Sequence, residues 1–183
     1  ITKLGMSGEI TFSESVKKRF ELASPSLGDI DKFINDAMPS SISSGFKALF
    51  TVLNSFNIDI WIISGGLKKV IQPFAAYLGV EKEKIIALEG RWDSQGDFIE
   101  VIKTDSLISK VSAAKTYQAK WQNPVIVIGD GYTDYQLKKA KIADFFICYT
   151  EHVQREQVMP LADIVANSAK GLEKLLLEKI RVL

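Results

Sequence analysis

The pattern of apolar and polar positions divides the chain into two parts near residue 55. In the first part, apolar residues recur at intervals of three and four, which is typical of helices that bury one face. Prolines at 25 and 39 interrupt this pattern. We place the N-cap of the first helix at Ser13. The expected helices cover residues 15–23, 28–37 and 45–55.

After residue 55, short apolar runs alternate with helical patterns, which predicts an α/β fold with a parallel sheet. The runs at 58–63 and 125–128 are rich in β-branched residues, as in strands buried on both faces. We expect a hairpin that turns at residues 94–96. The other expected strands cover residues 84–88, 144–148 and 163–166. The expected helices cover residues 67–78, 106–120, 151–158 and 170–183.

Composition allows one domain with a sizeable core and a small appendage, since 46% of the 183 residues are hydrophobic. With 23 basic and 22 acidic residues and no like-charge run, we expect no nucleic-acid partner. The sequence shows no signal peptide and no apolar run that could span a bilayer, so we expect no membrane partner. Cys148 lies in an apolar run and is expected to be buried; a lone cysteine fits a reducing cytoplasm.

Two acidic residues follow the strand predicted at 125–128, in the stretch Gly-Asp-Gly-Tyr-Thr-Asp. In open α/β sheets, ligands bind at the carboxyl ends of the strands. Asp130 and Asp134 are therefore placed where a cation or a phosphate would bind, and the glycines let backbone N–H groups approach it. The alternative is that Asp130 is only a turn residue and Asp134 an acid in the first turn of a helix.

A second turn with the same placement is Ser64-Gly65-Gly66, between the strand at 58–63 and the helix at 67–78. A glycine turn at a helix N-terminus is suited to bind an anion. The alternative is that Ser64 merely caps the helix. Since parallel strands end at one edge of a sheet, we expect both turns to open onto the same edge.

Other candidate groups carry weaker signals. Lys110, Lys115 and Lys120 are spaced five residues apart, which does not keep them on one helix face, so most are expected to be solvated. His152 is the only histidine, and we expect a surface or core residue rather than a catalyst.

These residues resemble the motifs of the haloacid dehalogenase (HAD) superfamily. Ser64-Gly65-Gly66 resembles motif II, Lys110 lies nineteen positions before Gly129, as expected for motif III, and Gly-Asp-Gly-X-Thr-Asp resembles motif IV. Within the superfamily the chain is similar to the phosphoserine phosphatases. Met6, Phe12 and Arg19 have the spacing of the cap residues that enclose phosphoserine in that family.

The resemblance implies a HAD-type Rossmann-like parallel sheet with helices on both faces and a small helical cap. Residues 1–55 would form the cap region and a linker helix, and residues 56–183 the α/β core. It also implies a Mg²⁺-dependent cytoplasmic phosphatase of serine biosynthesis that hydrolyses a small, phosphoserine-like metabolite through an aspartyl-phosphate. The oligomeric state is left open.

The resemblance also implies residue roles. Asp130 would bind Mg²⁺ directly, and Asp134 would bind it or orient a water on it. Ser64 and Gly65 would hold a phosphoryl oxygen. Lys110 would pair with nucleophile and phosphoryl oxygens, and Thr133 would contact the substrate or the nucleophile.

The cap residues would give specificity. Arg19 would clamp the substrate carboxylate, while Met6 and Phe12 would close over the substrate. The alternative for Arg19 is a solvated helix arginine beside Lys17 and Lys18.

The family's motif I, Asp-X-Asp-X-Thr, which supplies the nucleophile and the general acid, has no match in this sequence. The family pattern places it roughly thirty residues before Met6. Its strand would lie between the strands at 58–63 and 125–128, and its loss would leave buried backbone groups unpaired at about 1–3 kcal/mol each. We therefore expect it upstream of Ile1; the alternative is that another segment fills the gap.

Two other functions remain open at this point. The chain could be a phosphatase for another small phosphomonoester, because the cap match rests on three residues. It could also be a non-catalytic relative that binds a phosphorylated metabolite or partner without turnover.

Overall fold

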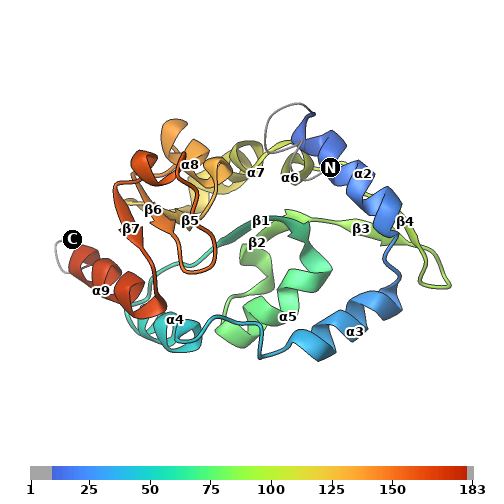
Figure 1. The fold of residues 1–183 in the computed structure, drawn as a ribbon, viewed down its shortest axis with the longest axis horizontal. Coiled ribbons are helices and arrows are strands. Elements are labelled where there is room, and N and C mark those ends of the chain that lie inside the picture. The colour runs from blue at the N-terminus through green and yellow to red at the C-terminus, as the bar shows by residue number, and fades with distance from the viewer. Residues whose placement is uncertain (1–9, 181–183) are drawn as a thin grey trace. The chain divides into compact units, whose positions relative to one another are not determined.

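A computed structural model describes residues 10–180 of the chain, in which helices alternate with short strands (Figure 1). The strands are β1 (Ile62–Leu67), β2 (Ile85–Leu88), β3 (Gly90–Trp92), β4 (Phe98–Val101), β5 (Ile126–Gly129), β6 (Phe145–Tyr149) and β7 (Ile164–Ala166). The α-helices are α2 (Phe12–Ala23), α3 (Leu27–Ala37), α4 (Phe46–Ser55), α5 (Lys68–Leu78), α6 (Asp105–Ile108), α7 (Lys110–Tyr117), α8 (Tyr132–Lys139) and α9 (Ala169–Ile180). Short 3-10 helices cover Lys82–Lys84, Gln118–Lys120 and Met159–Leu161.

The chain folds into two compact units, each described by itself below. The first contains the described residues up to Ile42 and the segment Ile60–Thr116, and the second contains Ser43–Asp59 and the chain from Tyr117 onward. Neither border coincides with the division predicted after residue 55. The assignment of a cap and a core stays a prediction.

In the first unit, β1 pairs in parallel with β2, and the register shifts between Ile63 and Leu67. β3 and β4 form the predicted antiparallel hairpin. Helix α5 packs on β1 and β2, and α3 packs on α5. The buried core of this unit joins helices and strands through Val16, Ile30, Leu67, Leu88, Val101 and Leu107. Burial of these apolar side chains is the main stabilising term for the unit.

In the second unit, β5, β6 and β7 form a parallel sheet in that order, which confirms the three predicted strands. Helix α8 packs on β5 and β6, and α9 packs on α4 and β7. Phe146 and Cys148 of β6 are fully buried, as predicted for Cys148. Parallel pairing with helical connections is the α/β class that the sequence pattern predicts.

The start of α2 differs from the prediction. The N-cap is Thr11, not Ser13: its hydroxyl accepts a hydrogen bond from the Glu14 N–H at 3.2 Å. The Glu14 carboxylate in turn accepts from the Thr11 N–H at 2.8 Å. This capping box satisfies two orphan donors at once, whereas a cap at Ser13 would satisfy one. The helix therefore begins three residues earlier than the apolar pattern indicates, at Phe12 rather than at residue 15.

The continuous helix predicted over 106–120 is wrong. The backbone is extended at Ser109, with φ −169°, and separates α6 from α7. The Ser109 hydroxyl accepts a hydrogen bond from the Ser112 N–H at 3.0 Å. A serine that caps a new helix start competes with helix continuation at the same position.

The helix predicted over 151–158 is also wrong, since that segment forms turns followed by a 3-10 helix. The Ser43 hydroxyl lies 2.6 Å from Nε2 of His152, and Arg155 is bonded to Asp130. These contacts to other elements compete with the intrinsic helix preference of the segment.

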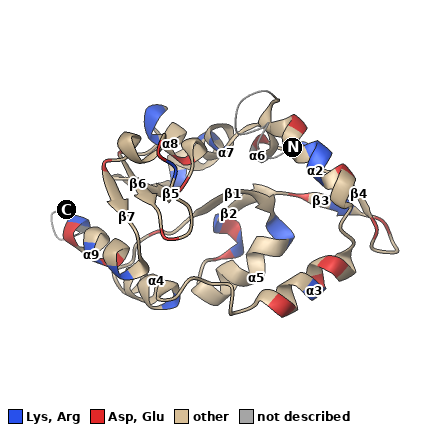
Figure 2. Ribbon diagram, in the orientation of Figure 1, with Lys and Arg blue, Asp and Glu red and all other residues tan. Residues whose placement is uncertain are grey.

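Charged residues of both signs are interspersed along α2, α3 and α9 (Figure 2). Val16 of α2 and Ile30 of α3 are nearly inaccessible, whereas Leu22 of α2 and Phe33 of α3 are exposed. Within residues 10–180, the structure contains no helix that combines the length and the apolar character needed to cross a bilayer.

Candidate functional site

The predicted phosphate-binding turn Ser64-Gly65-Gly66 lies inside β1 rather than after it, because the strand runs from Ile62 to Leu67. The sequence prediction of a strand at 58–63 is thus shifted, and the glycines coincide with the register irregularity of β1. The Ser64 hydroxyl accepts a hydrogen bond from the Gly66 N–H at 3.1 Å. Ser64 therefore shapes this stretch locally and still has its own O–H to donate to a ligand.

Two predicted substrate-binding residues, Phe12 and Gly65, are brought together. A Cβ atom placed on Gly65 would lie 2.9 Å from Cζ of Phe12, so the ring of Phe12 packs on the bare backbone of this position. Glycine at 65 permits this close approach.

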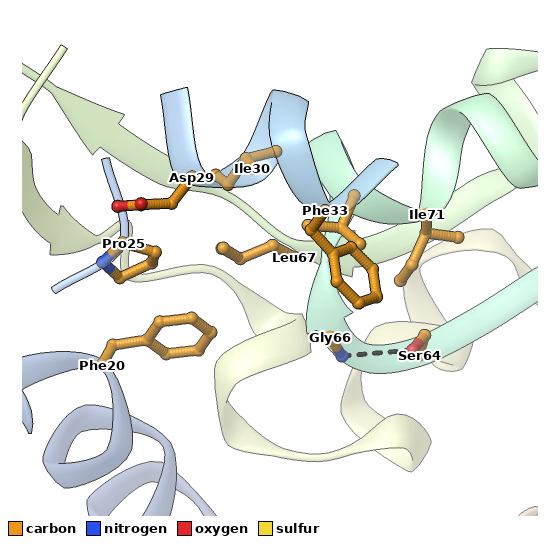
Figure 3. Close-up of a pocket in the computed structure, with 10 residues that line it drawn as sticks. Phe20, Pro25, Asp29, Ile30, Phe33, Ser64, Gly66, Leu67 and Ile71 are labelled. Carbon is orange, nitrogen blue, oxygen red and sulfur yellow. Dashed lines mark hydrogen bonds between the residues drawn. The ribbon is translucent and has the colours of Figure 1, made fainter. Parts of the chain in front are cut away.

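Ser64 and Gly66 line a cavity of about 340 Å³ within the first unit (Figure 3). Its other walls are mostly apolar and come from α2, α3, α5, the link between α2 and α3, and the end of β1. Besides Ser64 and Gly66, the lining residues are Phe20, Pro25, Asp29, Ile30, Phe33, Leu67, Val70 and Ile71. Phe20 and Phe33 were not among the predicted site residues, because their spacing is that of ordinary helical core positions. Arg19 is not among the described residues that line this cavity.

The second predicted site lies where β5 ends and α8 begins. The Gly131 N–H donates a hydrogen bond to Oδ2 of Asp134 at 3.1 Å, and the Asp134 N–H donates to the Gly131 carbonyl at 3.0 Å. Asp134 is only 6% exposed, whereas the side chain of Asp130 is 45% exposed. Asp134 thus holds the turn closed, and Asp130 presents its carboxylate toward solvent.

A charged environment surrounds this turn. Burial raises the pKa of the Cys148 thiol, and the negative charges of Asp130 and Asp134 raise it further. Asp130 also borders a cavity of about 300 Å³ in the second unit, together with Phe46, Tyr149 and His152. Carboxylates beside an accessible cavity are suited to bind a hard cation.

One partner of Asp130 was not predicted. Nε and Nη2 of Arg155 donate hydrogen bonds to Oδ2 of Asp130 at 3.2 and 3.1 Å. Arg155 lies twenty-five residues after Asp130 in a segment with a helical pattern, so no local sequence signal links the two.

The donor types at this turn fit Mg²⁺. Asp130 and Asp134 both offer oxygen atoms, and Mg²⁺ in proteins is bound by few carboxylates and several waters. Among the described residues, no group of three or more His, Cys, Asp or Glu side chains is placed to hold a metal.

The remaining predicted residues are placed as follows. Lys110 is the first residue of α7, in the first unit. Arg19 bends back on its own helix, since its Nε donates to the Ser15 carbonyl at 3.2 Å. Thr133 is exposed in the first turn of α8, and Met6 lies outside the described residues. His152 is exposed, which is one of the two placements, surface or core, that the sequence left open.

Comparison with known proteins decides the family. The pattern of the haloacid dehalogenase-like hydrolases matches residues 7–139, well over half of the chain. The chain belongs to the haloacid dehalogenase-like hydrolases. This confirms the resemblance drawn from Ser64-Gly65-Gly66 and Gly129–Asp134.

Relatives of this HAD-like chain include phosphoserine phosphatases. The chloroplastic phosphoserine phosphatase of Arabidopsis thaliana is 32% identical over 166 residues, which cover 88% of this chain and 56% of that protein. The chain therefore spans little more than half the length of that relative.

Solved structures agree with the fold. A phosphoserine phosphohydrolase-like protein from Francisella tularensis is 42% identical, with a TM-score of 0.89 over 96% of this chain and 82% of that one. A phosphoserine phosphatase solved as a phospho-aspartyl intermediate analogue has a TM-score of 0.72 at 19% identity, over 95% of this chain and 82% of that one. The HAD Rossmann-like fold class predicted from the sequence is thus confirmed.

Proposed function

We propose that this HAD-like chain serves a Mg²⁺-dependent phosphatase of small phosphomonoesters, with phosphoserine as the first substrate to test. The observation that carries the proposal is the turn after β5, where Asp130 lies half-exposed beside a cavity and Asp134 is fixed by the Gly131 N–H. A phosphomonoester dianion needs positive charge and hydrogen-bond donors before a nucleophile can approach it.

Each candidate residue of this chain would have its own role in phosphate binding and hydrolysis. Asp130 and Asp134 would hold Mg²⁺, which neutralises phosphate charge when bound. The Ser64 O–H and the Gly65 N–H would donate to a phosphoryl oxygen, and Lys110 would add a mobile positive charge. Thr133 would contact the substrate or the nucleophile. The proposal assigns the nucleophile to no residue among the 183, because none matches the family's motif I.

Specificity for phosphoserine rests on the helical segment before β1. The names of the relatives favour this substrate. Arg19 would swing from the Ser15 carbonyl to the substrate carboxylate, and Phe12, together with Met6, would cover the substrate. Arg19 is half-buried on α2, one residue before Phe20, which lines the cavity beside Ser64. A cytoplasmic location and a role in serine biosynthesis are part of the same proposal.

One observation favours a second candidate. The cavity beside Ser64 is walled mainly by apolar side chains such as Phe20, Phe33 and Ile30, and Asp29 is the one charged residue among the described residues that line it. Such walls favour a phosphate ester with an apolar remainder over an amino acid, whose ammonium and carboxylate groups require polar partners.

The test is phosphate release from a panel of small phosphomonoesters with and without Mg²⁺, by protein expressed from its complete coding sequence. We expect Arg19→Ala to lower kcat/KM roughly ten- to a hundredfold for phosphoserine, as for loss of a charged bidentate contact, and hardly at all for p-nitrophenyl phosphate. Lys17→Ala, on the same helix, is the matched control.

An equal fall on both substrates would assign Arg19 to cap folding instead. Preference of the wild type for apolar esters would favour the second candidate. Mg²⁺-independent binding of phosphate esters without turnover would indicate a non-catalytic relative and contradict the proposal.

A further inference from the structure

Arg155 is the least expected residue at the turn after β5. Its guanidinium donates two hydrogen bonds to a single oxygen, Oδ2 of Asp130, at 3.2 Å from Nε and 3.1 Å from Nη2. The two side chains are 34% and 45% exposed, so the pair is partly shielded from water. A charge-assisted contact of this kind is stronger than a fully solvated ion pair.

The backbone fixes Arg155 in this position. Its carbonyl accepts hydrogen bonds from the Val158 N–H at 2.8 Å and the Met159 N–H at 3.0 Å. Val158 is 4% exposed and packs in the cluster formed with Phe146 and Cys148 of β6. The arginine is therefore anchored to the core of the second unit rather than carried on a loosely attached loop.

The sheet explains why Arg155 meets Asp130. β5 and β6 run in parallel with Gly129 opposite Cys148, so the segments that follow both strands leave the sheet at the same edge. Asp130 begins the first segment, and Arg155 lies in the second. The cavity of about 300 Å³ beside Asp130 is lined by His152 and Val153 of that second segment.

A cation that binds Asp130 meets this arginine in one of two ways. It either takes Oδ2 from the guanidinium, or it binds the other oxygen next to a fixed positive charge. Both routes make binding less favourable, through a lost hydrogen bond or through repulsion between like charges.

We propose that Arg155 is a positioning residue of the cation site, which holds Asp130 while no divalent cation is bound and competes with the cation for that carboxylate. The inference rests on the proposed function, because it takes Asp130 as the Mg²⁺ ligand. It adds that the chain itself sets the cation concentration at which the site fills.

The experiment measures binding rather than turnover. Mn²⁺ is titrated into the metal-free protein and free Mn²⁺ is followed by electron paramagnetic resonance, with Mg²⁺ added as competitor. We expect Arg155→Gln to lower the dissociation constant roughly three- to tenfold, as for removal of one partly exposed ion pair. Arg155→Lys, which keeps the charge but loses the fork, should fall between Arg155→Gln and wild type. The difference in dissociation constant between wild type and Arg155→Gln should become smaller as added KCl screens the charges.

Arg91→Gln is the matched control, since it removes an arginine from a pair with Glu100 on the β3–β4 hairpin. It should leave the dissociation constant unchanged, and thermal unfolding without metal checks that every variant is folded. If Arg155→Gln bound Mn²⁺ as tightly as wild type or more weakly, the inference would be overturned, but the proposed function would not. Absence of binding in wild type and every folded variant would overturn both the inference and the cation step of the proposed function.

Discussion

At the scale of single residues, the candidate cation site depends on the absence of a side chain at position 129. A Cβ atom built on Gly129 would lie 2.2 Å from Cγ of Asp134 and 2.4 Å from its Oδ2. No such contact is sterically possible, so the Asp134 carboxylate occupies space that only glycine leaves open. The same carboxylate closes the turn through the Gly131 N–H.

Gly129→Ala should therefore displace Asp134 and destabilise the protein. We expect a loss of about 1–3 kcal/mol in the free energy of unfolding, as for overpacking of a filled site, together with weaker Mn²⁺ binding. Urea unfolding and the Mn²⁺ titration measure the two effects.

Gly28→Ala is the matched control for this change. Its Cβ would meet only Ser26 Oγ at 3.7 Å, an ordinary contact, in exposed helix α3. It should leave stability unchanged or raise it by up to about 1 kcal/mol. Equal effects of both alanines would contradict the steric account.

The sequence predicted the residues of the site that lie close together in a motif. Asp130 and Asp134 are found because a strand, two glycines and two acids occur within one short stretch. Arg155 could not be found in this way, since its link to Asp130 depends on the pairing of β5 with β6. The residue roles assigned to Ser64, Lys110 and Arg19 stay predictions.

At the scale of helices and strands, most elements were predicted because a helix or strand buries one face at a regular period. Three of the exceptions share one cause, which is a polar side chain bonded in competition with the local pattern. Thr11 moves the start of α2, Ser109 divides the predicted helix over 106–120, and Arg155 leaves the segment after β6 non-helical. The periodicity of apolar residues cannot predict such polar contacts.

Asp163 gives an example of an element fixed by a single carboxylate. It accepts a hydrogen bond from the Phe146 N–H of β6 at 2.8 Å and a second one from Lys138 of α8, just before β7 begins. Burial alone would raise the pKa of Asp163, but the bonds from Lys138 and the Phe146 N–H outweigh it and hold the pKa below the ordinary value.

This lowered pKa predicts a pH dependence. A depressed pKa means that the ionised form stabilises the fold, so the contribution is complete above the ordinary pKa of 3.8 and is lost as the pH falls through the lower folded value. At neutral pH, Asp163→Asn should lower the free energy of unfolding by about 1–3 kcal/mol relative to wild type. In acid this difference should become smaller, because the wild-type carboxylate is then protonated. Urea unfolding at a series of pH values measures this.

Asp31→Asn, on an exposed position of α3, serves as the control for Asp163→Asn and should change stability little. If the deficit of Asp163→Asn stayed constant from neutral to strongly acidic pH, the stabilisation would not come from the ionised carboxylate.

At the scale of the whole molecule, the proposed catalytic groups are divided between the two compact units. Ser64 and Lys110 belong to the first unit, and Asp130, Thr133 and Asp134 belong to the second. The proposed function assigns Ser64 and Asp130 to the same reaction. Residues that stabilise one transition state lose their effects together, so their mutations are strongly non-additive.

The double variant Ser64→Ala with Asp130→Asn tests this requirement. We expect Ser64→Ala alone to lower kcat/KM roughly ten- to a hundredfold through loss of one phosphoryl contact, without any change in Mn²⁺ affinity. Asp130→Asn alone should abolish Mn²⁺ binding and most turnover. The double variant should be hardly slower than Asp130→Asn, because a phosphate that is not neutralised gains little from one hydroxyl.

Ser55→Ala, whose hydroxyl only bonds the Val52 carbonyl of its own helix, replaces Ser64→Ala in the control pair and should leave kcat/KM unchanged. Losses that multiply in full would mean that Ser64 and Asp130 act independently, and the assignment of both residues to one transition state would then be wrong.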